Sequence, residues 1–393
     1  MKRTIKLLLL TVLGTWMAGS AWADDYFVNG DGTIGWKSGN EYNLSPAALV
    51  NVSDNVWVWA GKMNANKNFR ITGINCGVFW ATSNGDLLGT EEKSLKNTQD
   101  GGDFSFVVAE EGIYKVTVNT SALTIKAEKM AEPTKIGDYY QIATVNDYYW
   151  FAGTVTSAES STAKAQLTAD LDFAETGFFP LACDMFKFKG EFDGAGHTIS
   201  NAKIIGTNNN VAFVRYATGG TNIHDLIIEG SFEGNAKIGG IIGFARDNGG
   251  EVKLTNVINK ATVHSSGSSD ANAGGLVGCA TDGVKITALN CANMGAVSGQ
   301  NGQCAAFAGW TQNGTTFTNC WNSGAISNIE NSAQLYRNSG SVTAVNTYDL
   351  TNVGDQGIKL NATTLGSGEL AYRLNGDQSV INWYQNLGTD ADA

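Results

Sequence analysis

Short apolar runs alternate with polar turns along the chain, and one such pattern recurs loosely three times in the second half. Its first element reads IGGIIG at 238–243, AGGLVG at 273–278 and CAAFAG at 304–309. Each copy continues through a polar turn to a segment that contains an asparagine, namely Asn256, Asn290 or Asn319. The repeat length of roughly 30 to 35 residues is typical of solenoids. Because β-branched residues and glycine dominate and helical periodicity is missing, we predict a repeated unit of strands and turns.

The repeats predict a parallel β-helix from about Gln166 to about Asn346. Inward apolar residues would stack on their equivalents in the next coil, and glycine pairs would sit at corners where backbones approach. The repeated Asn256, Asn290 and Asn319 predict a ladder of side-chain amides at one turn. A long stacked surface of this kind supports recognition more readily than a single catalytic pocket.

Two short helices are predicted at the ends of this solenoid. The polar pair at 146–147 predicts the N-terminus of an aromatic helix over 148–152. A second short helix is predicted over 367–375, where Gly376 ends it. We expect the first helix to cover one open end of the core, and the second, together with Trp383 and Tyr384, to cover the other.

The first part of the chain has a different pattern. Seven strand segments alternate with Gly, Asn and Asp turns, at 26–28, 56–59, 69–71, 78–80, 104–108, 114–118 and 123–125. This spacing predicts a β-sandwich of immunoglobulin type over 24–130. A linker at 131–138 contains Pro133, which stops a strand. The predicted fold class is therefore all-β: a sandwich, then a parallel β-helix with short capping helices over 139–393.

The N-terminus and the composition indicate export. Residues 1–23 combine a basic start, an apolar core at 7–13 and the small-x-small site at 21–23, which is typical of a cleavable signal peptide. We expect an exported protein at the cell surface or outer membrane, in the medium or in the periplasm. The net charge of -11 argues against nucleic acid as a partner. No later segment is long enough and apolar enough to predict a transmembrane span.

Six cysteines are present among the 393 residues, and export permits disulfides. Cys291 and Cys320 occupy the same position in successive repeats, so they predict either a ladder of thiols inside the core or a disulfide between them. No Cys or His spacing indicates a zinc site, and no metal or other cofactor is predicted.

The tryptophans of the first domain are candidate sugar contacts. Trp57 and Trp59 are two residues apart on a predicted strand and therefore point to one face. Trp36 and Trp80 add two rings, and Lys62 and Arg70 supply hydrogen-bond donors nearby. Flat aromatic rings with polar groups at their rim match the faces and hydroxyls of a pyranose. The alternative is that most of these rings belong to the core.

Two regions resemble known families. The segments at 35–36, 59–63, 69–71, 112–118 and 123–125, with Trp80, resemble the carbohydrate-binding modules of the SusE and SusF starch-binding proteins, over about residues 26–127. This resemblance implies glycan binding, of an α-glucan such as starch. Those relatives are lipid-anchored, whereas no cysteine lies near the predicted cleavage site here, so their mode of anchoring does not carry over.

The second resemblance covers about residues 139–390. The run at 274–278 and its relatives at 239–243 and 305–309 resemble the GLUG motif of exported bacterial surface proteins, as do the segments at 168–173, 188–199 and 368–377. Ala305 and Ala306 replace the glycine pair in the third repeat, which suggests a looser corner. Proteins of this kind are described as adhesins or surface proteins, and the motif has no assigned chemistry.

We therefore predict a non-catalytic polysaccharide-binding protein with the β-helix as a stalk or a second binding face. The carboxylate pairs Asp170 with Asp172 and Asp184 with Asp193 have the scale of a glycosidase site, but Asp193 lies in an ordinary tight turn. No catalytic residue is predicted. The first alternative is a surface adhesin that binds a host or neighbouring bacterial protein. The second is a β-helix polysaccharide lyase or glycoside hydrolase, which rests on fold analogy alone.

Overall fold

The computed structural model describes residues 25–36, 46–74, 78–97, 104–157, 161–206, 208–247, 249–312, 314–327, 331–351, 354–360, 367–376 and 378–385. The described chain is mostly β-structure and contains two helices, α1 and α3. The predicted signal peptide at 1–23 and Cys76 lie outside the described residues. Among the residues described, neither helix is long and apolar enough to cross a membrane.

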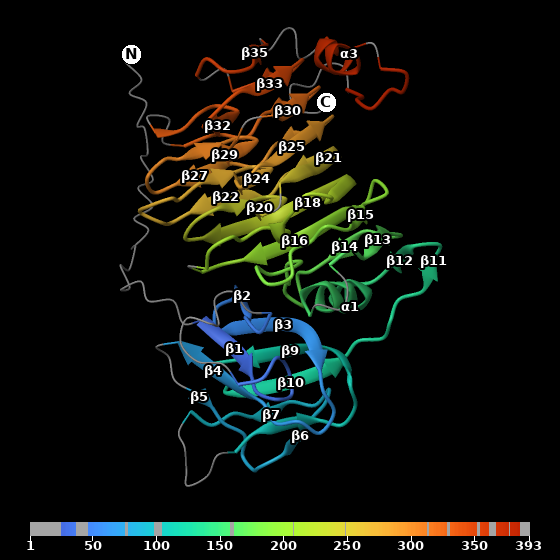
Figure 1. The fold of residues 1–393 in the computed structure, drawn as a ribbon, viewed down its shortest axis with the longest axis vertical. Helices are drawn as coiled ribbons and strands as arrows, with labels where there is room; N and C mark the ends of the chain where they lie inside the picture. Colours follow the sequence, from blue (N-terminus) through green and yellow to red (C-terminus); the bar gives the residue numbers. More distant parts are fainter. Residues whose placement is uncertain are drawn as a thin grey trace, which may run out of the picture.

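The first ten strands form the N-terminal β region, which lies at the bottom of Figure 1. A three-stranded antiparallel sheet has the order β1 (Asp25–Asn29), β4 (Arg70–Ile74), β5 (Val78–Phe79). A five-stranded antiparallel sheet has the order β2 (Val50–Ser53), β3 (Val56–Met63), β9 (Gly112–Asn119), β10 (Thr124–Lys129), β7 (Lys93–Ser94). The strands β6 (Asp86–Leu88) and β8 (Phe106–Val108) pair in parallel. All seven predicted strand segments are therefore present.

Alternation of side chains builds the core of this region. Ile71 on β4, Trp59 on β3 and Val116 on β9 are buried in one hydrophobic cluster. The Trp57 ring packs edge-on against Tyr26 of the other sheet, with ring centroids 4.9 Å apart. The two sheets thus bury their facing apolar side chains against each other, as strand periodicity requires.

The remaining strands form the coil array, a stack of successive chain turns above the N-terminal region (Figure 1). Its largest sheet contains β11 (Lys135–Ile136), β12 (Tyr139–Ile142), β13 (Lys164–Leu167), β14 (Leu171–Asp172), β15 (Glu191–Asp193), β16 (Thr198–Ile204), β18 (Asn222–Gly234), β21 (Gly250–Asn259), β22 (Thr262–Ser265), β25 (Val284–Leu289), β26 (Ala292–Asn293), β27 (Val297–Gly299), β30 (Thr315–Thr318), β31 (Trp321–Asn322), β33 (Val342–Val345), β34 (Tyr348–Asp349) and β35 (Ile358–Lys359). The β11–β12 pair is antiparallel, whereas successive coils pair in parallel, as β18 and β21 do. The strand β11 begins inside the predicted linker, so the array starts earlier than expected.

Two smaller parallel sheets complete the coils. One is β17 (Val214–Ala217), β20 (Ile242–Ala245), β24 (Val277–Ala280), β29 (Ala308–Thr311) and β32 (Tyr336–Asn338). The other is β19 (Ile238–Gly239), β23 (Ala273–Gly274) and β28 (Cys304–Ala305). In the latter, Ile238 pairs with Ala273 and Ala273 pairs with Cys304, so the three repeats predicted from sequence stack in register.

The amide ladder lies three residues beyond its predicted position. Asn256, Asn290 and Asn319 have φ angles of 55°, 53° and 53°, so they occupy left-handed corners. The continuous buried ladder runs instead from Asn259 to Asn293 and from Asn293 to Asn322, each amide donating to the next over 2.9 Å. Asn322 donates in turn to Asp349 over 3.0 Å. At the corners, Asn256 donates to Asp225 over 2.7 Å and Asn346 donates to Asn319 over 2.8 Å. The predicted ladder through Asn256, Asn290 and Asn319 is therefore present only in part, because a left-handed corner is itself a common role of asparagine.

A glycine is required beside this ladder. A Cβ atom on Gly275 would lie 2.1 Å from the Asn293 Oδ1 and 2.3 Å from the Ala306 carbonyl oxygen. The repeated glycine pair therefore admits the buried amide against the backbone. The third repeat carries Ala306 at the next level of the stack.

Helix α1 (Val145–Thr156) lies between the two parts of the molecule (Figure 1). It begins with Thr144 as N-cap, in a capping box with Asp147, two residues before the predicted cap. A Cβ atom on Gly153 would lie 2.5 Å from the Ile113 side chain and 3.0 Å from the Gly61 nitrogen, so the helix packs directly on β3 and β9. The helix therefore caps the array, as predicted, and also joins it to the N-terminal region through one hydrophobic cluster.

Helix α3 (Glu369–Asn375) lies beside the last coils (Figure 1) and is followed by Gly376, as predicted. Together with Trp383 it packs against Ala292, Trp321 and Tyr348 of successive coils, in a hydrophobic cluster separate from the core of the array, so it covers one side of the coils and not the end of the core. Trp383 is buried in this cluster, with its ring 6.0 Å from the ring of Trp321. Tyr384, which was expected in this cap, is exposed.

The five described cysteines are buried and form no disulfide. Cys291 donates its backbone N–H to the Cys320 Sγ at 3.4 Å, so the two thiols stack within the core as the thiol-ladder expectation states.

Candidate functional site

Three of the six predicted sugar-contact residues form one stack on the three-stranded sheet. The Arg70 guanidinium carbon lies 4.7 Å from the centre of the Trp36 ring and 4.4 Å from that of Trp80. Arg70 is on β4, Trp36 follows the turn after β1, and Trp80 follows β5. The adjacent Ile71 points into the core, so alternation turns Arg70 to the opposite face of the sheet.

The stack is pre-organised by these contacts. A guanidinium held over an indole face gains cation–π attraction, and two indoles restrict its rotation. Trp36 remains 44% exposed and Trp80 is half-buried. The exposed indole offers an apolar face suited to a sugar ring, and the guanidinium offers N–H donors at its edge.

In the structure the Trp57 and Trp59 rings are buried and are not accessible to a ligand. Their exposed fractions are 7% and 2%, and the Trp59 Nε1–H donates to the Pro46 carbonyl over 2.7 Å. The expectation that they contact sugar is therefore corrected: both rings face the core, between β3 and the β1–β4–β5 sheet. Alternation along β3 gave their common side correctly, but that side is the buried one.

Lys62 lies away from the aromatic stack. It is near the end of β3, pairs with Glu111 at 3.1 Å, and lines a groove that Tyr140 and Trp150 also line. This groove lies between the N-terminal region and α1. The structure thus brings Trp36, Arg70 and Trp80 together and places Lys62 at a different surface.

Asp170 and Asp172, the first carboxylate pair weighed for catalysis, act as hydrogen-bond acceptors at turns, whereas Asp184 of the second pair forms an ion pair with Lys187 at 3.0 Å. Asp170 accepts from the backbone N–H of Thr198 over 2.9 Å and lies 3.1 Å from a His197 ring nitrogen, and these contacts lower its pKa. Asp172 accepts from the backbone N–H of Ala174 over 2.9 Å, which also lowers its pKa. A glycosidase acid needs a raised pKa beside an ionised partner. In the Asp170–Asp172 pair, both pKa values are lowered.

One cluster of titratable groups was not singled out from the sequence. Ligand atoms of Asp193, His224 and Asp225 lie within 4.8 Å of one another on neighbouring coils. The two ring nitrogens of His224 lie 2.8 Å from an Asp225 oxygen and 3.1 Å from a Glu191 oxygen. Burial alone would lower the pKa of His224, but the bonds to Asp225 and Glu191 outweigh it and raise the pKa. The groups could hold a divalent cation only in competition with that proton.

Comparisons with known proteins give little guidance. No family model and no curated protein matches the chain. A crystal structure from Bacteroides ovatus, described provisionally as an immunoglobulin A1 protease, matches with a TM-score of 0.37 and 16% sequence identity. The match covers 60% of this chain and 86% of that chain. A likeness this distant carries no argument about function.

Proposed function

We propose that the chain is an exported, non-catalytic polysaccharide-binding protein whose contact site is the stack of Trp36, Arg70 and Trp80. The single observation that carries this proposal is the exposed Trp36 ring held against a guanidinium that also contacts the Trp80 indole. Such a ring can stack on a pyranose while Arg70 donates to hydroxyl groups. The resemblance to SusE and SusF modules makes an α-glucan the first ligand to test.

We infer that the antiparallel sheets of the N-terminal region are an immunoglobulin-like sandwich and that the coil array is a parallel β-helix of the GLUG type. Parallel pairing of successive coils and the Asn259–Asn293–Asn322 ladder support the second inference. In this arrangement the array is a stalk that presents the sandwich, and export through the residue 1–23 leader places it outside the cytoplasm.

The test is binding of the full-length protein to starch, to maltoheptaose and to a panel of unrelated polysaccharides, measured by affinity electrophoresis and calorimetry. Trp36→Ala and Trp80→Ala should each lower α-glucan affinity about tenfold, because an aromatic contact to a ligand is worth roughly 1–2 kcal/mol. The matched control is Trp310→Ala, which removes a half-buried ring from a similar stack with Arg337 on the array.

Equal loss in Trp310→Ala would place glycan contacts on the array and defeat the assignment of the site. Folded protein that binds no glycan in the panel would refute the proposed function. It would leave the adhesin alternative, which burial of all four candidate rings would have favoured; Trp57 and Trp59 are buried, whereas Trp36 is exposed.

A further inference from the structure

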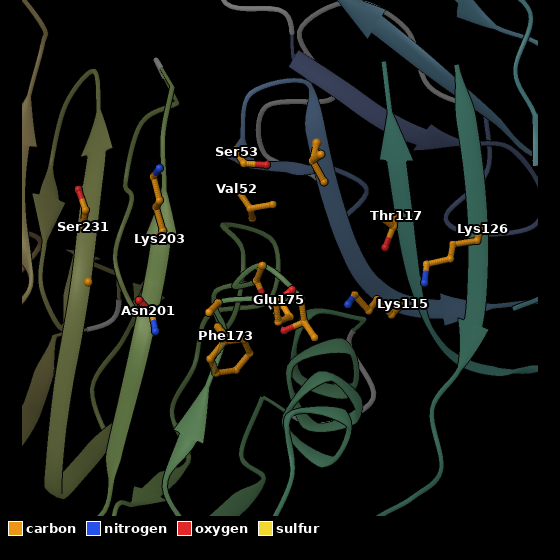
Figure 2. A pocket seen from close by; sticks show the side chains of 15 residues that line it. Val52, Ser53, Lys115, Thr117, Lys126, Phe173, Glu175, Asn201, Lys203 and Ser231 are labelled. Atoms are coloured by element: carbon orange, nitrogen blue, oxygen red, sulfur yellow. Dashed lines mark hydrogen bonds between the residues drawn. The ribbon is translucent and has the colours of Figure 1, made fainter. Parts of the chain in front are cut away.

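A cavity of about 590 Å³ lies where the N-terminal region meets the coil array. Figure 2 shows its two walls: Lys115, Thr117 and Lys126 come from β9 and β10, whereas Asn201, Lys203 and Ser231 come from β16 and β18. Ser53 on β2 closes one side, and the loop after β14, with Glu175, closes another. Its volume is within the range of small-molecule sites. This junction cavity shares no residue with the aromatic stack.

The charge of the lining is opposite to that of the chain. Three lysines and one glutamate line the cavity, whereas the whole protein has a formal net charge of -11. Lys126 is partly neutralised by Glu128 at 3.2 Å. Lys203 is exposed at the rim of the opposite wall. A concave wall with an excess of cations in an acidic protein favours an anionic ligand.

Lys115 is a buried lysine on the cavity wall that forms no ion pair among the described residues. Its exposed fraction is 6%, yet among the described residues its ammonium has no hydrogen bond or ion pair, and its recorded partner is the Tyr149 ring, 4.4 Å from Nζ. Burial lowers its pKa to about 8. Buried lysines are normally paired, because desolvating a charge is costly. An aromatic face compensates one side of the ammonium and leaves its other N–H donors to the cavity that Lys115 lines.

Polar groups around Lys115 fit a hydroxylated ligand. The Thr117 Oγ1 is buried and has no hydrogen-bond partner among the described residues. Ser53, Ser231 and Asn201 add hydroxyl and amide groups on the other walls. The Tyr149 hydroxyl proton is not available to a ligand, because it is donated to the Gly177 carbonyl over 2.6 Å.

We propose that the junction cavity binds a small acidic saccharide, a hexuronic acid or its dimer, with Lys115 as counter-ion to the carboxylate. The carboxylate would accept from the Lys115 ammonium, and the sugar hydroxyls would bond to the Thr117, Ser53 and Asn201 side chains. This site is independent of the proposed α-glucan contact, since the two share no side chain. The hydroxyl oxygens of a neutral glucan can accept from Lys115, but a neutral glucan has no charge to offset the ammonium.

Protonation gives the site a characteristic pH dependence. Carboxylate binding needs charged Lys115, so affinity should fall as pH rises through about 8, by about tenfold between pH 7 and pH 9. The other charged groups that face the cavity are Lys126 and Glu128 on β10, Glu175 after β14 and Lys203 on β16.

The test is calorimetric binding of galacturonate and digalacturonate to the full-length protein at pH 7, with glucose, maltose and inorganic sulfate as comparison ligands. Lys115→Met should lower uronate affinity at least tenfold and abolish the fall between pH 7 and pH 9. Lys203→Met, at the exposed rim, should lower it about threefold. Lys93→Met is the matched control on β7 and should leave it unchanged.

Lysine Nζ resonances supply a second readout that does not depend on a mutant. Saturating uronate should raise the pKa of Lys115, because an adjacent carboxylate favours the charged amine. The proposal is overturned if wild-type protein does not bind uronate at pH 7, or if Lys115→Met binds it as well as wild type. Sulfate that binds as tightly as uronate would overturn the saccharide assignment.

Discussion

Replacing Lys115 with Met should change how the stability of the protein depends on pH. The folded protein holds the Lys115 pKa near 8 by burial, whereas the ordinary value of 10.5 applies to the unfolded chain. Between these two values the unfolded chain binds more protons than the folded one. The free energy of unfolding of the wild type therefore rises with pH across that window.

The magnitude follows from the two pKa values. A fall from 10.5 to about 8 corresponds to about 3 kcal/mol of destabilisation when Lys115 is charged in the fold. Most of this destabilisation disappears as the Lys115 amine loses its proton. The linkage relation therefore gives a rise of about 2 kcal/mol in the unfolding free energy between pH 7 and pH 9.5. Methionine has a similar length and no charge, so Lys115→Met should lack this gain.

Urea titrations at pH 7, 8, 9 and 9.5, followed by tryptophan fluorescence, measure the effect. The quantity to compare is the difference in unfolding free energy between variant and wild type, because titration of the tyrosines and thiols then cancels. This difference should shift by about 2 kcal/mol in favour of wild type as pH rises. Parallel curves for the two proteins would refute the reasoning, since they would mean that Lys115 keeps its ordinary pKa in the fold. Lys93→Met should give such parallel curves.

Two further predictions concern the coil array. Asn293→Ala should lower the unfolding free energy by about 2–4 kcal/mol, because it deletes one buried hydrogen bond on each side and leaves Asn259 and Asn322 with unpaired polar atoms. Urea titration measures this free energy. The control substitution Asn209→Ala, at an exposed position, should change it by under about 0.5 kcal/mol. Burial raises the pKa of Cys279 to about 12 and of Cys304 to about 11, so native protein at pH 8 should resist iodoacetamide at both. Peptide mass spectrometry checks the second prediction, and rapid labelling of either thiol before unfolding would contradict it.

Much of the fold could be predicted because its signals are local. Strand alternation and turn residues placed the seven N-terminal strands, and the repeated IGGIIG-like segments gave the register of β19, β23 and β28. The two helices followed from capping residues and a terminal glycine. The ladder was misplaced because asparagine serves two purposes in each coil: Asn256 takes a left-handed corner, whereas Asn259 bonds within the core.

The site was predicted less well, because exposure depends on which elements cover a strand. Odd-numbered positions of β3, such as Trp57, face the other sheet, and even-numbered ones, such as Ala60, face α1. A strand covered on both sides has no solvent face, and alternation cannot reveal the second cover. Trp36 and Trp80 lie outside regular strands, at the open face of a small sheet, where a ring can remain accessible.

The same argument explains why the junction cavity escaped the sequence. Lys115 and Thr117 are two residues apart on β9, and a polar pair with this spacing predicts a solvent face. Helix α1 covers that face, and its Tyr148 and Tyr149 hydroxyls hold the loop after β14 at the Phe179 and Gly177 carbonyls, over 3.0 and 2.6 Å. The walls are therefore fixed before any ligand arrives, which lowers the cost of binding. A buried ammonium that has no ion pair among the described residues is a local cost to the fold, and an acidic ligand would supply the charge that offsets it.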